Sequence, residues 1–86
     1  EMKSVTIYST MMCPYCSAAK NLLSRKGVKY DEIDETFAPG TRSDMTRRAG
    51  GKRSVPQILL GADHVGGCDE LHSLEHAGKL DPMLKG

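Results

Sequence analysis

No run of apolar residues in this 86-residue chain is long enough to span a lipid bilayer. The formal net charge is only +1, so no general attraction to nucleic acid or to an anionic membrane is expected. The sequence shows no secretory signal, no internal repeat and no low-complexity tract. These absences predict one domain over residues 1–86, located in the cytoplasm, with no nucleic-acid or membrane partner, and we expect a monomer. Glu1, which precedes Met2, is assigned no role.

Cysteine is scarce, with three residues in the whole chain: Cys13, Cys16 and Cys68. An odd count argues against the disulfide framework of a secreted protein and suits a reducing compartment. A CxxC pair can supply half of a zinc site, but no second pair follows and the three histidines are scattered. A structural disulfide across so short a loop would constrain the unfolded chain very little. The pattern therefore favours a redox-active dithiol, with a zinc module as the weaker alternative.

The cysteine pair stands between a predicted strand and a predicted helix. Residues 4–9 are rich in β-branched and aromatic side chains, and from Pro14 to about Lys26 apolar residues recur at helical spacing. Proline suits the first helical position, which puts Cys13 at the N-cap. Unpaired N–H groups and the positive end of the helix dipole then favour the nucleophilic thiolate of Cys13. Cys16 lies one turn along the helix, close enough to form a disulfide.

A second strand is predicted over residues 28–34, which gives a parallel strand–helix–strand unit. In the loop that follows we expect Phe37 to act as an anchor and Pro39-Gly40 to form a turn. A short helix is predicted over 41–49, opened by a Thr-Arg-Ser-Asp sequence that resembles a capping box. Met45 is its clearest core residue.

The C-terminal half is predicted to contain a hairpin and a helix. Residues 54–60 and 64–66 form its two strands, joined by a tight turn. A third helix opens near residue 67 and ends near residue 78, with Asp69 as its N-cap. A last helical turn over 80–84 is expected to cover the core.

Basic residues concentrate in the second predicted helix and the loop after it. A solvated helix face and a docking site for a small anion or an acidic partner are equally good interpretations of this group. The residues are Arg42, Arg47, Arg48, Lys52 and Arg53.

The order of elements, with CxxC after the first strand, resembles the thioredoxin-like fold, and three motifs resemble those of the glutaredoxins. The motifs are Cys13-Pro14-Tyr15-Cys16, Ser54-Val55-Pro56 and Gly66-Gly67-Cys68-Asp69-Glu70-Leu71, and the resemblance covers essentially the whole chain. It implies an α/β fold with a four-stranded mixed sheet flanked by helices. It also implies a glutathione-dependent thiol–disulfide oxidoreductase that acts on glutathionylated and disulfide-containing proteins. Glutathione would be a co-substrate, and no metal is expected.

The resemblance also implies roles for individual residues. Cys13 would be the nucleophile and Cys16 the resolving thiol. The Val55–Pro56 bond is expected to be cis, turning the Val55 backbone towards Cys13. Arg42 is the candidate for holding the glycine carboxylate of glutathione. The glutathione-binding residues implied in this way are Tyr15, Arg42, Ser54, Val55, Pro56, Cys68, Asp69 and Glu70.

The chain departs from the family pattern before and after these motifs. Relatives often have a lysine shortly before the nucleophile, where this chain has Thr10, Met11 and Met12. Glu70 replaces the usual aspartate, and Cys68 suits packing better than redox chemistry. Two other functions stay open: a hydrogen donor fed by a thioredoxin-type reductase, and an iron–sulfur carrier that shares a cluster across a dimer.

Overall fold

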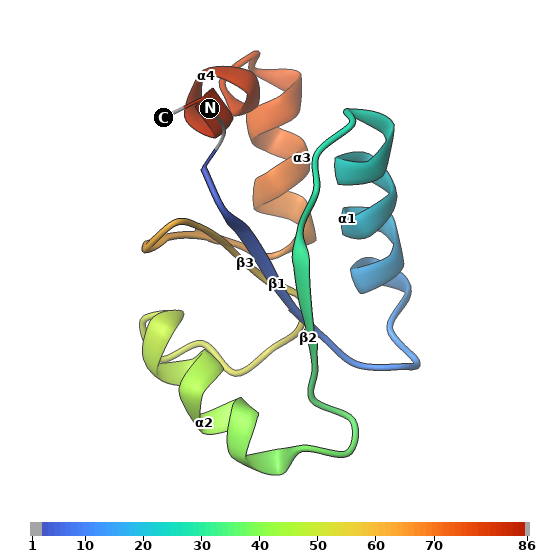
Figure 1. Ribbon diagram of the computed structural model, residues 1–86, viewed down its shortest axis with the longest axis vertical. Coiled ribbons are helices and arrows are strands. Elements are labelled where there is room, and N and C mark those ends of the chain that lie inside the picture. Colours follow the sequence, from blue (N-terminus) through green and yellow to red (C-terminus); the bar gives the residue numbers. More distant parts are fainter. Residues whose placement is uncertain (1–2, 86) are drawn as a thin grey trace.

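The computed structural model describes residues 3–85, so Glu1 lies outside the described residues (Figure 1). Strands and helices alternate along the first half of the chain, as an α/β fold requires. The elements are β1 (Val5–Ser9), α1 (Pro14–Arg25), β2 (Asp31–Asp34), α2 (Pro39–Arg48), β3 (Gln57–Leu60), β4 (Asp63–Gly66), α3 (Cys68–His76) and α4 (Leu80–Lys85). Over residues 3–85, no helix combines the length and the apolar character that a bilayer crossing demands.

The strands form one four-stranded sheet in the order β2-β1-β3-β4. β1 runs parallel to β2 and antiparallel to β3, and β3 pairs with β4 in an antiparallel hairpin. This mixed sheet, flanked by helices, confirms the predicted fold class. Because β1 and β2 are parallel, their C-terminal ends meet at one edge of the sheet, and the loops that follow them lie there together.

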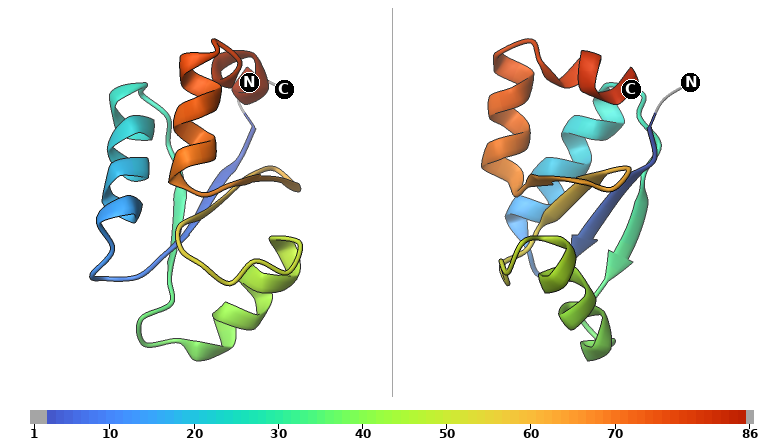
Figure 2. Two further views of the ribbon diagram at one scale, coloured as in Figure 1. Left: turned by 180° about the vertical axis from the view of Figure 1, so that it is seen from behind. Right: turned by 90° about the vertical axis from the view of Figure 1, so that its left-hand side faces the viewer.

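Alternation along the strands divides the core between the two faces of the sheet. Val5 and Ile7 of β1 pack on the face covered by α1 and α3, and Figure 2 shows these two helices side by side on that face. Tyr8 of β1 turns to the opposite face, where it packs with Met45 of α2 and Leu59 of β3. Burying side chains of this size stabilises the fold by about 1.5–3 kcal/mol each.

The second strand is shorter than predicted, because residues 28–30 turn away from β1. Gly27 takes a left-handed conformation (φ 71°) after α1. The N–H of Val28 then donates to the Leu23 carbonyl at 3.0 Å, and its side chain is buried. Pairing with β1 begins only where Asp31 lies opposite Thr6.

The second helix begins earlier than predicted, and its predicted cap is wrong. α2 starts at Pro39, so the expected Pro39-Gly40 turn is the first part of the helix, and its N-cap Ala38 has no side-chain hydrogen bond. Asp44 does not cap the helix, because its Oδ2 accepts a hydrogen bond from the Tyr8 hydroxyl at 2.9 Å. Phe37 is not an anchor either, since its side chain is exposed. Met45 is fully buried, as predicted.

The hairpin and the third helix are confirmed with shifted limits. β3 begins at Gln57 rather than at residue 54, which leaves 54–56 as an extended segment before the strand. The N-cap of α3 is Gly67 and not Asp69. The carboxylate of Glu70 reaches back to the Gly67 N–H, and this contact fixes the start of the helix two residues earlier.

Candidate active site

Cys13 and Cys16 form a disulfide at the start of α1, with their Cα atoms 5.2 Å apart. Cys13 is the N-cap, as predicted, in an extended conformation (φ −131°, ψ 99°) that precedes Pro14. The backbone N–H of Cys16 donates to Cys13 Sγ at 3.1 Å. When the disulfide is reduced, the same N–H and the helix dipole would stabilise a negative charge on this sulfur.

The two sulfurs differ in their access to solvent. Cys13 is half-buried, whereas Cys16 is 1% exposed and belongs to the inner side of α1. An incoming partner can therefore reach Cys13 but not Cys16. The burial of Cys16 suits a thiol that acts only on a partner already bonded to Cys13.

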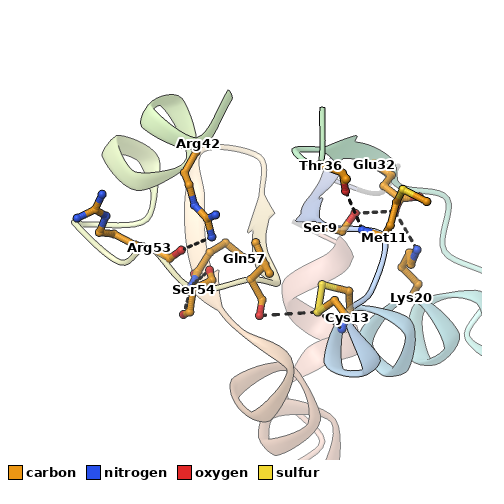
Figure 3. Close-up of a disulfide and its surroundings, with 12 residues drawn as sticks. Ser9, Met11, Cys13, Lys20, Glu32, Thr36, Arg42, Arg53, Ser54 and Gln57 are labelled. Carbon is orange, nitrogen blue, oxygen red and sulfur yellow. Dashed lines mark hydrogen bonds and ion pairs between the residues drawn. A yellow bond between two sulfur atoms is a disulfide. The ribbon is translucent and has the colours of Figure 1, made fainter. Parts of the chain in front are cut away.

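The segment 54–56 lies next to Cys13, and Figure 3 shows its approach. The Val55–Pro56 peptide bond is cis, as the sequence predicted. The carbonyl oxygen of Val55 is 3.9 Å from Cys13 Sγ. This sulfur has no hydrogen to donate in the disulfide, so the contact becomes an S–H···O hydrogen bond only in the reduced thiol.

A side-chain relay that the sequence did not predict holds this segment in place. Gln57 Nε2 donates to the Ser54 carbonyl at 2.9 Å and to its hydroxyl at 3.2 Å. Gln57 Oε1 accepts from His64 Nε2 at 2.6 Å, because an amide oxygen only accepts. The relay therefore connects the 54–56 segment, which lies next to Cys13, to His64 of β4. The only signal for it in the sequence is a polar residue at the head of an otherwise apolar strand.

An open cleft of about 180 Å³ runs between the 54–56 segment and the start of α3. It brings together all the predicted glutathione-binding residues except Arg42. Arg42 instead donates from Nη2 to the Arg53 carbonyl at 2.9 Å, on a neighbouring surface, so its assigned role stays a prediction. The cleft is lined by Tyr15, Ser54, Val55, Pro56, Gly67, Cys68, Asp69 and Glu70.

The start of α3 supplies the polar end of this cleft. Asp69 is exposed in the first helical turn, while Glu70 Oε1 accepts the Gly67 N–H at 2.6 Å. Gly66 has φ 125°, and a Cβ there would lie 2.7 Å from Glu70 Oε1. Glycine is therefore required at this position both by the backbone conformation and by the approach of the carboxylate.

Cys68 is a buried free thiol at the edge of the cleft. Burial raises the pKa of this thiol, and the neighbouring charges of Asp69 and Glu70 raise it further. The ring of His72 contacts it, with Nδ1 at 3.4 Å from Sγ and 2.9 Å from the Cys68 carbonyl oxygen. A thiol in this state is protonated at neutral pH, which agrees with its interpretation as a packing residue.

Residues 3–85 contain no group of three or more His, Cys, Asp or Glu side chains arranged to hold a metal ion.

Comparison with protein families and curated proteins gives a consistent result. Residues 5–65 match the family model described as Glutaredoxin. The chain is 54% identical over 83 residues to the protein named Glutaredoxin from Pseudomonas aeruginosa, covering 96% of this chain and 98% of that protein. It is 46% identical over 84 residues to Glutaredoxin 3 from Escherichia coli K12, covering 98% and 100% of the two chains.

Solved structures agree. The solution structure of a glutaredoxin from Brucella melitensis superposes with a TM-score of 0.85 at 50% identity, covering 98% of this chain and 90% of that one. The crystal structure of a buckwheat glutaredoxin–glutathione complex superposes with a TM-score of 0.84 at 32% identity, covering 95% and 76%.

Proposed function

Because the chain belongs to the glutaredoxin family of thiol oxidoreductases, we propose that it uses glutathione to reduce protein–glutathione mixed disulfides and protein disulfides. The observation that carries this proposal is the position of Cys13 Sγ. This sulfur is accessible, caps a helix, accepts an N–H at 3.1 Å, and lies beside a cleft lined by eight residues.

In the first step, the Cys13 thiolate attacks the glutathionyl sulfur of a protein–glutathione mixed disulfide. A bond forms between Cys13 Sγ and the glutathione sulfur, and the bond from that sulfur to the protein breaks. The protein leaves as a thiolate and takes up a proton from water. Exchange of this kind requires the attacking sulfur to be a thiolate. The helix N-terminus favours the thiolate form of Cys13.

In the second step, a glutathione thiolate attacks the glutathionylated Cys13. Oxidised glutathione leaves and Cys13 returns to the thiolate. Two glutathione equivalents are thus joined by one disulfide, while the protein substrate gains the two electrons. This route requires only Cys13.

Protein disulfides need the second cysteine. Attack by Cys13 gives a mixed disulfide with the substrate, which Cys16 then resolves by attacking Cys13 Sγ. The substrate leaves reduced, and the Cys13–Cys16 disulfide present in the structure remains. Glutathione reduces this disulfide in two further exchanges of the same kind.

The cleft would hold the glutathionyl group in these reactions. The Val55 backbone would pair with the cysteinyl part of glutathione in the manner of an added strand. The first N–H groups of α3 would receive the γ-glutamyl carboxylate, and the exposed Asp69 carboxylate would face its amino group. Tyr15 would form the wall next to Cys13. Glu70 is already engaged by Gly67 N–H, so Asp69 is the better partner for the amino group.

The test is turnover of a glutathionylated peptide with glutathione as the only reductant, which also distinguishes this function from a donor fed by a protein reductase. Cys13→Ser should abolish turnover, and Cys16→Ser should retain it while losing activity on protein disulfides. Ser73→Ala, at an exposed position of α3 outside the cleft lining, is the control and should behave like the unaltered protein. Turnover by Cys13→Ser, or a requirement for a protein reductase, would overturn the proposal.

A further inference from the structure

The exposed large apolar side chains of residues 3–85 belong to the loops after β1 and β2 and to the first turn of α1, at the end of the sheet that carries the disulfide. They are Met11, Met12, Tyr15 and Phe37, and the most exposed are Met12 at 92% and Phe37 at 84%. Single apolar residues on a surface are ordinary, but a group of them beside a reactive atom marks a contact surface. Tyr15 lines the cleft described above. We name the other three, Met11, Met12 and Phe37, the apolar rim.

Two hydrogen bonds hold the loops of the apolar rim against each other. The backbone N–H of Met11 donates to Thr36 Oγ1 at 2.8 Å, and the N–H of Thr36 donates to Asp34 Oδ1 at 2.8 Å. The first bond connects the loop after β1 to the loop after β2, which carries Phe37, and the second holds Thr36 in place within that second loop. The parallel pairing of β1 and β2 makes this possible, because it brings both loops to one edge of the sheet. The two loops that carry the rim are therefore held together at this edge of the sheet.

The apolar rim and the cleft approach Cys13 from different directions. Figure 3 shows Met11 and Thr36 on one side of Cys13, and Ser54 on another. Met12 is the residue directly before Cys13. When Cys13 attacks the glutathionyl sulfur, the sulfur of the protein substrate is still bonded to that sulfur at about 2.05 Å. The residues next to the substrate cysteine therefore pass close to Met12 and to the loops that the Met11–Thr36 hydrogen bond joins.

We propose that the apolar rim is a docking surface for a protein substrate that carries a large apolar side chain next to its reacting cysteine. The inference rests on the proposed function and adds a preference to it. Methionine side chains are flexible and polarizable, so Met11 and Met12 can adapt to aliphatic and aromatic partners of different shape. Phe37 adds a rigid aromatic surface. Contact with the rim places the substrate sulfur while the cleft holds glutathione.

The experiment compares two glutathionylated peptides that differ only in the residue after cysteine, leucine in one and serine in the other. The mixed disulfide of cysteine and glutathione serves as a small substrate without that residue. For the unaltered protein we expect a kcat/KM about fivefold higher for the leucine peptide, the scale of one apolar contact in a partly open site. In Met12→Ser/Phe37→Ser the ratio should fall to about one, while the small substrate keeps its turnover. Lys79→Ser, an exposed residue of the loop between α3 and α4, is the matched control and should keep the full ratio.

Equal ratios in the double variant and in the unaltered protein would overturn the docking surface, because both proteins would then read the peptide without the rim. A thermal unfolding curve confirms that the double variant is folded. If the unaltered protein turned over none of the three substrates with glutathione, the proposed function itself would fail. The two failures are therefore distinguishable.

Discussion

Glu35 carries a buried carboxylate that the described part of the chain leaves without a hydrogen-bond partner. Its side chain is only 6% exposed, and neither carboxylate oxygen is paired within residues 3–85. The residue follows β2, where its backbone N–H donates to the Ser9 carbonyl at 2.9 Å. Burial raises the pKa of this carboxyl group, and the positive charge of Arg42 opposes the shift. An ionised Glu35 should therefore cost the folded state stability.

The perturbation that tests this reasoning is Glu35→Gln, which removes the charge and keeps the shape. Because the folded pKa lies above the unfolded one, the folded state binds more protons between the two values, and stability falls as pH rises through that window. Leaving a buried polar group unsatisfied costs about 1–3 kcal/mol, and more for a charged group. The glutamine amide is also unsatisfied, so only the excess for the charge is recovered. We expect Glu35→Gln to stabilise the protein by about 1 kcal/mol at about pH 8, which is about 4–8 °C in Tm for a domain of this size.

The assay is denaturant and thermal unfolding of both proteins at several values between about pH 4 and about pH 8. The stability difference should be largest at the alkaline end and shrink towards the acidic end, where Glu35 is protonated. Asp34→Asn is a control of opposite sign, because the hydrogen bonds from Thr36 lower the pKa of Asp34. Its loss of stability should stay constant over this pH range and fade only below the ordinary aspartate pKa of about 3.9, so this control is measured down to about pH 2. A difference for Glu35→Gln that does not change with pH, or a loss at the alkaline end, would refute the reasoning.

Two further substitutions test the supports of the cleft. Gln57→Ala breaks the relay from His64 to Ser54. We expect the free energy of unfolding to fall by about 1 kcal/mol and the KM for glutathione to rise. An unchanged KM in a folded variant would contradict the role of Gln57 in positioning the 54–56 segment. Gly66→Ala places a Cβ against Glu70 Oε1, and should cost about 1–3 kcal/mol and release the Gly67 N–H, which amide hydrogen exchange would show as faster exchange at that group; an unchanged exchange rate would argue that the carboxylate simply moves aside.

The local chemistry around the cysteine pair was predictable from the sequence. Proline at the first helical position and a strand directly before it determine where Cys13 stands, and the structure confirms the N-cap. The order of elements and the β-branched and aromatic composition of residues 4–9 are likewise short-range patterns, and together with the family resemblance they predicted the α/β sheet correctly. The cis bond before Pro56 was also expected, but through the resemblance of the 54–56 motif and not from its spacing.

Long-range contacts were not predictable in the same way. The sequence around Asp44 has the form of a capping box, but the hydroxyl of Tyr8, 36 positions away, takes that carboxylate. The Gln57 relay depends on the register of the β3–β4 hairpin, which brings His64 within 2.6 Å. Phe37 was expected to anchor its loop, yet its side chain is exposed and the hydrogen bond from Met11 to Thr36 holds the loop instead. In each case, a partner far along the chain decides where the side chain goes.

The unequal solvent access of the two sulfurs limits how many substrates can be covalently bound at once. A substrate arriving from solution can react with only one of the two sulfurs, because Cys16 is 1% exposed. The protein can thus form a mixed disulfide with one substrate at a time. Cys16 releases a bound protein by an intramolecular attack on Cys13 Sγ. The rate of this step is set by the position of the two cysteines in the fold and not by the concentration of a thiol in solution.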